Sequence, residues 1–356
     1  MEPLSAGLPE GHSARTPGAD DLDTLVALVD RRRALTPGRG PVDPAAVTAE
    51  VVGLGSWTRR QVVVEDATGS LCGWASVHDR AAGRSDLRVV VDPDCSETDA
   101  IASGLFDWTE AAARVVAVER DVHETRLELL LDSGDEVLKA WAAAAQHRLT
   151  RTWLNMTRPV SPGDVVPEPR PGVVVRRVRV HDLGDGTTMP VAEDLQTVHR
   201  MLEESFADHF NSYRESFPEF TQRLREDPGH GWDHWWLALV EIDGRLVPGG
   251  ALVSTSTAAD ENGVQGSYID YIGVHRRARG RGVAKALLLT VIADAAERGR
   301  DRVALEVDDD SSTGADGLYR AMGWDTEYVT ESWHKDLDLL RRSDRIVPYV
   351  RVADTP

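Results

Sequence analysis

Residues Tyr268-Ile-Asp-Tyr-Ile-Gly-Val-His-Arg-Arg-Ala-Arg-Gly-Arg-Gly-Val-Ala-Lys-Ala-Leu-Leu288 place an apolar strand, a basic glycine-rich turn and an Ala/Leu-rich helix in immediate succession. Glycine lets the backbone approach a ligand closely, and the first N–H groups of a helix attract negative charge. Arginines at positions 276, 277, 279 and 281 add full positive charges to the turn. The segment therefore predicts an anion site that suits a pyrophosphate. The glycines do not complete the G-x-G-x-x-G pattern of dinucleotide folds, and the Walker A pattern is absent from the sequence.

A second informative segment, Ser312-Thr-Gly-Ala-Asp-Gly-Leu-Tyr-Arg-Ala-Met-Gly-Trp324, follows a predicted strand at Val303–Val307. Together the two segments resemble the GNAT family of N-acetyltransferases. Arg279–Ala284 matches the family's R/Q-x-x-G-x-G/A signature, and the second segment is similar to its N-x-x-A-x-x-L-Y-x-x-x-G-F element. Ser312 stands where Asn is usual and Trp324 where Phe is usual. A serine can still donate and accept a hydrogen bond.

This resemblance implies acetyl-CoA as cosubstrate, with no metal. Backbone groups of the turn are expected to hold the coenzyme A pyrophosphate, and the end of the preceding strand to hold the pantetheine arm and the thioester carbonyl. The cofactor-binding residues implied in this way are Ile272, Gly273, Val274, Arg279, Gly280, Arg281, Gly282, Val283, Ala284 and Ser312.

Two residues are candidates for proton transfer. Tyr319 corresponds to the family's tyrosine that protonates the departing thiolate, a step that suits a phenol with a pKa of about 10. The alternative is a core aromatic on its helix. Asp270 is the only carboxylate on the strand before the turn and shares a face with Tyr268, where the family's glutamate would lie. We expect Asp270 to be the general base or to bind the amine, and the alternative is a solvated strand residue.

The acceptor side is expected in the segment Phe206–Phe217, where Asp208, His209 and Tyr213 are candidate contacts. His230 and His234 have the i, i+4 spacing of a metal site, but no third ligand accompanies them, and no metal is predicted.

The chain also carries a weak internal repeat. Leu71–Ala75 aligns with Val247–Ala251 at an offset of 176 (247 minus 71), and Arg126–Asp132 aligns with Arg302–Asp308 at the same offset (302 minus 126). Each half reads as a hairpin, a third strand, a helix, a fourth strand, a helix and a closing strand, with Asp243-Gly244 as one hairpin turn. We expect an α/β fold of two tandem GNAT-like domains with mixed sheets.

The domain boundaries follow from a proline-rich stretch at 161–172, which is predicted to be a linker. Residues 1–18 are expected to be a disordered leader, 19–160 a degenerate GNAT-like domain and 173–356 the catalytic domain. The first half has Val91–Asp99 in place of the basic turn, and its three aspartates, one glutamate and proline would repel a pyrophosphate. The tandem arrangement is similar to that of mycothiol synthase.

Length and composition limit the number of domains and the kinds of partner that the chain can have. With 356 residues the chain is long enough for two domains. A formal net charge of −19 disfavours nucleic acid and favours small cations such as protonated amines. No membrane span or secretory signal is expected, so we predict a cytoplasmic protein, a monomer or homodimer. Cys72 and Cys95 are interpreted as two ordinary thiols.

The predicted function is transfer of an acetyl group from acetyl-CoA to a primary amine of a small molecule, by direct attack in a ternary complex. Two alternatives remain open from the sequence. One is an antibiotic acetyltransferase of the aminoglycoside type, and the other is a non-catalytic CoA-binding regulatory module.

Overall fold

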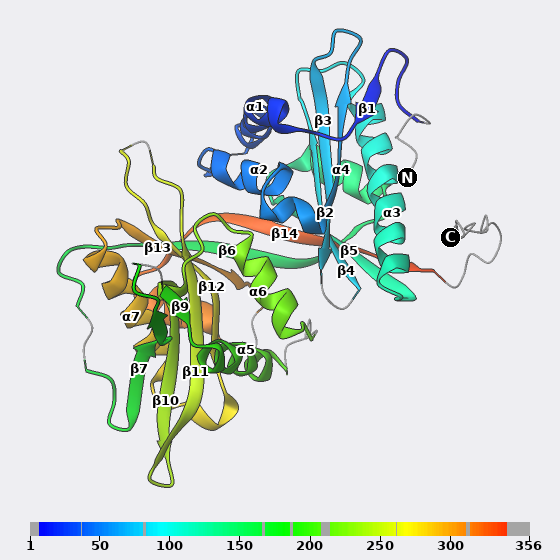
Figure 1. Ribbon diagram of the computed structural model, residues 1–356. Coiled ribbons are helices and arrows are strands. Elements are labelled where there is room, and N and C mark those ends of the chain that lie inside the picture. The colour runs from blue at the N-terminus through cyan, green and yellow to red at the C-terminus, as the bar shows by residue number, and fades with distance from the viewer. Residues whose placement is uncertain are drawn as a thin grey trace.

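The computed structural model of this chain describes residues 7–36, 38–80, 83–165, 168–185, 188–207, 214–260, 262–310 and 314–339. Its main sheet has twelve strands in the order β1-β2-β3-β4-β5-β14-β6-β13-β12-β11-β10-β7, with helices on both faces (Figure 1). The mixed α/β class predicted from the sequence is confirmed.

The first half contains β1 (Ser13–Arg15), α1 (Leu22–Arg33), α2 (Pro44–Val51), β2 (Arg59–Glu65), β3 (Leu71–Arg80), β4 (Arg84–Val91), α3 (Thr98–Glu119), β5 (Glu124–Asp132), α4 (Glu136–Ala144) and β6 (Arg148–Pro159). The second contains β7 (Val173–Arg177), α5 (Ala192–Phe206), α6 (Phe217–Arg225), β10 (Trp235–Ile242), β11 (Arg245–Ser256), β12 (Ser267–Val274), α7 (Val283–Glu297), β13 (Arg302–Asp308), α8 (Ala315–Ala321) and β14 (Asp325–Asp338). Strands β8 (Val180–Asp182) and β9 (Thr188–Pro190) form a separate two-stranded sheet. Short 3-10 helices are η1 (Ala19–Asp21), η2 (Leu54–Thr58), η3 (Trp232–His234) and η4 (Arg276–Ala278).

The repeat is visible in the order of the elements. The sequence β2-β3-β4-α3-β5-α4 recurs as β10-β11-β12-α7-β13-α8. In each half one neighbouring pair is parallel, β4 with β5 and β12 with β13. The predicted hairpin turn is also present, because β10 ends at Ile242 and β11 begins at Arg245, and Asp243 and Gly244 both have positive φ.

The closing strands differ from expectation. We predicted that each half would end with its own strand, but β6 pairs with β13 of the second half and β14 pairs with β5 of the first. The two exchanged strands also pair with each other, at the middle of the sheet (Figure 1). An alternating strand pattern fixes which side chains share a face, but it does not specify the partner strand. The exchange therefore joins both halves through one continuous sheet.

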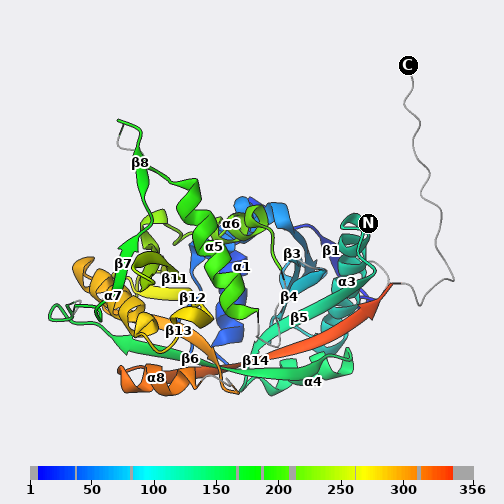
Figure 2. The ribbon, with the colours of Figure 1, turned by 90° about the horizontal axis from the view of Figure 1, so that it is seen from below.

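Strand alternation explains the two helical layers. Val62 and Val64 pack with α3, whereas Val63 between them packs with α1. In the second half Trp236 packs with α7, and Trp235 and Leu237 pack with α5 and α6. Helices α1, α2, α5 and α6 consequently pack on one face of the sheet, and α3, α4, α7 and α8 on the other. Figure 2 shows α1, α5 and α6 on the side opposite α4 and α8.

The two halves also touch on the side of the sheet that carries α2 and α6. Glu226, which follows α6, accepts hydrogen bonds from Arg59 Nη1 at 2.6 Å and from Thr58 Oγ1 at 2.7 Å. Arg120 and Glu219 form a second ion pair at 3.1 Å. None of the described helices has the length and apolar character needed to cross a bilayer.

Candidate cofactor and acceptor site

The centre of the candidate site is a divergence of two parallel strands. Strands β12 and β13 pair only from Ser267 with Val303 to Ile269 with Leu305. Beyond that point β12 continues to Val274, paired with β11 alone among the described strands. Residues 270–274 therefore offer one free backbone edge, which suits an extended chain that binds in strand-like fashion. Three of the predicted cofactor residues, Ile272, Gly273 and Val274, lie on this edge.

The predicted pyrophosphate turn follows directly. After His275 the chain forms η4, and Gly280 and Gly282 adopt left-handed conformations with φ of +76° and +85°. Gly282 is the N-cap of α7. Within the described part of the chain, no acceptor is found for the backbone N–H groups of Gly280, Gly282, Val283 and Ala284. The turn thus presents several free donors at a helix N-terminus, which is the arrangement that binds phosphates.

The arginines of the turn do not all point the same way. Arg279 is exposed, whereas Arg281 donates from Nη1 to the Glu241 carbonyl at 3.1 Å and so reaches towards β10. A residue that sequence reasoning missed lies beside the turn. Arg170, from the predicted linker, donates to the Gly280 carbonyl at 3.4 Å, and a Cβ added to Gly282 would lie 3.0 Å from its Cδ. No local motif marks Arg170, because its proximity comes from the path of the chain into β7.

Asp270 sits at a bulge in β12. The register shifts between Val253 and Ser254, so that Asp270 has no partner on β11. Its Oδ2 atom is buried and accepts no hydrogen bond from the described residues. Burial, together with the nearby Asp227 carboxylate, raises the pKa of Asp270 to about 8, and Arg223 partly opposes this rise. A carboxyl group with this pKa can accept a proton from an amine near neutral pH.

Tyr319 lies on α8, packed edge-to-face against Trp324 at 5.9 Å between ring centroids. Its side chain is 7% exposed and belongs to the core cluster under α7. Burial raises the pKa of Tyr319 to about 12. The phenol is therefore protonated at neutral pH. Its position agrees both with a core aromatic residue and with a proton donor to the departing thiolate.

Four predicted residues lie outside the described part of the chain. They are Ser312, at the family's Asn position, and the acceptor candidates Asp208, His209 and Tyr213. On either side of the acceptor segment, the rings of Phe220, which is buried, and Phe206, which is 36% exposed, lie 6.1 and 6.4 Å from the Tyr271 ring between centroids. Among the residues that the structure does describe, no group of three His, Cys, Asp or Glu side chains could hold a metal.

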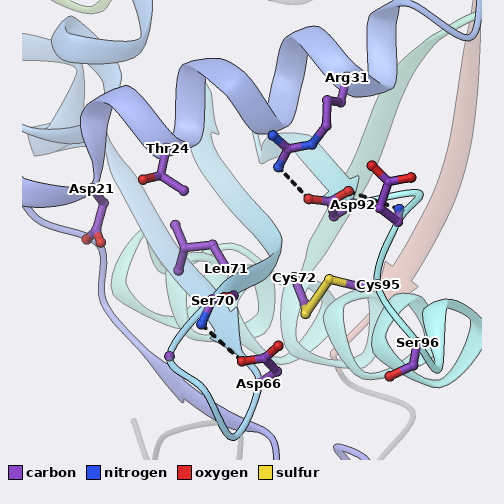
Figure 3. Close-up of a pocket in the computed structure, with 12 residues that line it drawn as sticks. Asp21, Thr24, Arg31, Asp66, Ser70, Leu71, Cys72, Asp92, Cys95 and Ser96 are labelled. Carbon is purple, nitrogen blue, oxygen red and sulfur yellow. Dashed lines mark hydrogen bonds and ion pairs between the residues drawn. A yellow bond between two sulfur atoms is a disulfide. The ribbon is translucent and has the colours of Figure 1, made fainter.

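The corresponding loop of the first half, residues 92–97, is two residues shorter than residues 275–282 and carries the opposite charge. Glu97 is the N-cap of α3 in a left-handed conformation (φ +60°), as Gly282 is for α7. Around this loop lies a cavity of about 620 Å³, whose lining includes several carboxylates (Figure 3): Asp21, Asp66, Asp92 and Asp94. Asp92 is paired with Arg31 of α1. The carboxylates at this loop would repel a pyrophosphate.

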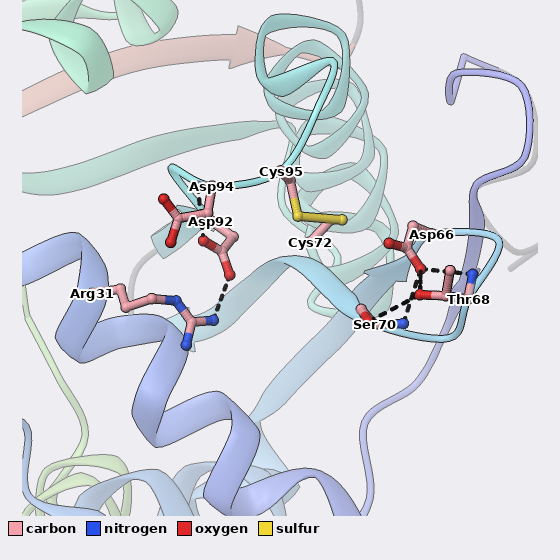
Figure 4. The surroundings of a disulfide bond; sticks show 8 residues. All are labelled: Arg31, Asp66, Thr68, Ser70, Cys72, Asp92, Asp94 and Cys95. Atoms are coloured by element: carbon pink, nitrogen blue, oxygen red, sulfur yellow. Dashed lines mark hydrogen bonds and ion pairs between the residues drawn. A yellow bond between two sulfur atoms is a disulfide. The ribbon is translucent and has the colours of Figure 1, made fainter.

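The interpretation of the two cysteines as ordinary thiols is wrong. Cys72 at the start of β3 and Cys95 in the loop after β4 form a disulfide (Figure 4). They are 23 residues apart in sequence and meet because β3 and β4 are neighbouring antiparallel strands. The disulfide ties the first half's loop to the sheet.

Comparison with known proteins gives consistent matches. A family profile described as acetyltransferase (GNAT) family matches residues 196–324. A GCN5-related N-acetyltransferase from Sphaerobacter thermophilus is similar in structure, with a TM-score of 0.68, 23% identity and coverage of 92% of this chain and 96% of that chain. A tandem GNAT protein from the clavulanic acid biosynthesis pathway gives a TM-score of 0.61, 14% identity and coverage of 91% and 98%.

Saccharomyces cerevisiae N-myristoyltransferase, solved with bound myristoyl-CoA, is similar to this chain with a TM-score of 0.56, 12% identity and coverage of 93% and 80%. At these identities the three structures show the shared fold. No match was found among curated proteins.

Proposed function

We propose that this chain moves an acetyl group from acetyl-CoA to a primary amine of a small molecule, since its residues 196–324 match the profile of the acetyltransferase (GNAT) family. Both substrates bind together, and the amine nitrogen attacks the thioester carbonyl directly. The observation that carries the proposal is the continuity between the free edge of β12 and the unpaired N–H groups of the turn.

That continuity matches the chemistry of an acyl-CoA. The pantetheine arm is an extended chain with amide groups, which suits a strand edge, and the pyrophosphate suits the turn at the start of α7. Arg170 adds a cation to this phosphate site from outside the motif. We assign the cofactor to the second half only, because the loop of the first half carries carboxylates and is linked to β3 by the disulfide.

The proton transfers are assigned to two residues. Asp270 takes a proton from the bound ammonium, which leaves the neutral amine to attack, because its raised pKa makes the carboxylate basic enough for that task. Tyr319 then donates to the leaving thiolate of coenzyme A, since its phenol is protonated at neutral pH. A backbone N–H on the free edge of β12 stabilises the oxyanion.

Acetyl-CoA binding, measured by titration calorimetry, tests the site. Gly282→Glu places a bulky anion among the free donors and should abolish binding. The matched control is Gly299→Glu at the other end of α7, where φ is also positive (+68°) and nothing lies within 4 Å of an added Cβ. Both variants place the same charged side chain at a glycine with positive φ, and the Gly282 variant additionally meets Arg170 Cδ at 3.0 Å from its Cβ. Equal affinity of the two variants for acetyl-CoA would contradict the assignment of the turn as the pyrophosphate site.

A further inference from the structure

His275, the residue between β12 and η4, is held on both sides of its ring. Nδ1 accepts a hydrogen bond from the Arg277 backbone N–H at 3.2 Å, so the imidazole caps the first turn of η4. Nε2 lies 3.2 Å from Glu204 Oε2 on α5. The ring is buried, at 4% exposed. Because Nδ1 acts as an acceptor, Nε2 carries the proton and donates it to Glu204.

Helix α5 is firmly placed above this point. A Cβ added to Gly273 would lie 2.9 Å from the Ser205 Cβ and 3.1 Å from a Leu202 methyl, so the helix crosses the end of β12 at close range. Glu204 therefore approaches His275 from a helix that packs closely against the end of β12. Its own side chain is 42% exposed, which leaves its charge in contact with water.

The first half contains the same arrangement with different residues. The Asp92 N–H donates to the Cys72 carbonyl at 2.9 Å, as the His275 N–H donates to the Gly249 carbonyl at 3.0 Å. Asp92 Oδ1 then accepts from the Asp94 N–H at 3.0 Å, which reproduces the cap of His275 on Arg277.

In both halves a charged residue from a neighbouring helix faces the capping side chain, but the sign of its charge differs. Arg31 of α1 pairs with Asp92, as Glu204 of α5 faces His275 (Figure 4 shows the first-half pair). The chain thus builds one capped turn twice. An aspartate is the ordinary cap for such a turn, and only the half with the basic turn replaces it by an imidazole. A carboxylate beside the free N–H groups would repel a phosphate, whereas a neutral imidazole supplies the acceptor without a negative charge.

We propose that His275 is a positioning residue for the cofactor: its Nδ1, held in the acceptor tautomer by the contact of Nε2 with Glu204, holds the pyrophosphate turn in its binding conformation. This inference rests on the proposed function, because it takes the turn to be the coenzyme A site. By capping Arg277, His275 fixes η4 and leaves the N–H groups from Gly280 onward directed at the ligand.

The test is acetyl-CoA affinity by calorimetry in a set of variants whose folding is checked by thermal unfolding. His275→Ala removes the cap and should weaken binding about five- to tenfold, the fold-change that corresponds to a lost cap. His275→Asn restores a neutral acceptor and should bring affinity to within about twofold of wild type. His275→Asp restores the cap but adds a carboxylate. It should bind at least about threefold more weakly than the Asn variant at low salt, with a smaller gap at high salt.

Asp92→Ala, which removes the corresponding cap in the first half, is the control and should leave the affinity for acetyl-CoA unchanged. Wild-type affinity in His275→Ala, with binding still abolished by Gly282→Glu, would overturn the inference and leave the proposed function standing. Unchanged affinity in Gly282→Glu would instead remove the proposed function. If His275→Ala does not fold, the inference is tested by comparing His275→Asn with His275→Asp. Equal affinities of these two variants for acetyl-CoA would contradict the need for a neutral cap.

Discussion

The proposed base makes a quantitative prediction about pH. A carboxyl group with a pKa of about 8 is ionised in about one molecule in eleven at pH 7 and in about ten in eleven at pH 9. If Asp270 must be ionised to accept the amine proton, its contribution to kcat/KM should rise about tenfold over that range. The perturbation is Asp270→Asn, which keeps the size of the side chain and removes its titration.

The assay must separate this rise from the titration of the amine itself, which also becomes more reactive as pH increases. We therefore expect the ratio of wild-type to Asp270→Asn kcat/KM, for one amine, to increase about tenfold between pH 7 and pH 9. The amine's own titration cancels in this ratio. A ratio that stays constant across the range would refute the assignment of Asp270 as base.

Stability gives a second readout that needs no substrate. The pKa of Asp270 is raised in the folded state above the ordinary carboxyl value of about 3.8, so folding takes up a proton between about pH 4 and pH 8. Wild-type stability should therefore fall as pH rises through that window, and Asp270→Asn should lack this part of the decline. Thermal unfolding of both proteins at pH 5 and pH 8 measures the difference. An equal change in stability between the two pH values for wild type and variant would mean that the pKa of Asp270 in the folded protein is near its ordinary value.

Three further predictions concern the leaving group, the first half and the exchanged strands. Tyr319→Phe should lower kcat by roughly 10²-fold with little change in acetyl-CoA affinity, and a wild-type kcat would mean that Tyr319 only packs in the core. Asp94→Arg with Glu97→Arg should leave turnover nearly intact, whereas a folded but inactive double variant would place the cofactor in the first half. Deleting residues 1–160 removes β6, which pairs with both β13 and β14, so the fragment should aggregate through its exposed strand edges. A soluble and active fragment from Gly172 onward would contradict the structural role given to β6.

The sequence predicted the features that depend on local residue patterns. Asp243-Gly244 is a turn because of its own conformational preferences, and the strand, turn and helix around Gly282 follow one another along the chain. The internal repeat and the mixed sheet were also predictable, since each half carries the same order of patterns. The family resemblance rested on two short motifs in the second half, and the family match spans both.

What the sequence did not predict depends on contacts between distant segments. The alternating pattern of β6 and β14 fixes which side chains share a face, but it is equally satisfied in either half's sheet. Cys72 and Cys95 meet only because neighbouring strands bring them together. Arg170 reaches the turn from a stretch that local patterns describe only as proline-rich. The high pKa of Asp270 likewise needs Asp227, which lies 43 residues earlier (270 minus 227).

The central claim is that the second half catalyses transfer of an acetyl group to an amine. It is tested most directly by incubating the full chain with acetyl-CoA and a panel of primary amines, and measuring free thiol and acetylated product together. We predict thiol release that depends on one class of amine, gives one acetylated amine per thiol, and is lost in Gly282→Glu but kept in Gly299→Glu. Tight acetyl-CoA binding without acetylation of any amine in the panel would contradict the claim and favour a non-catalytic CoA-binding module.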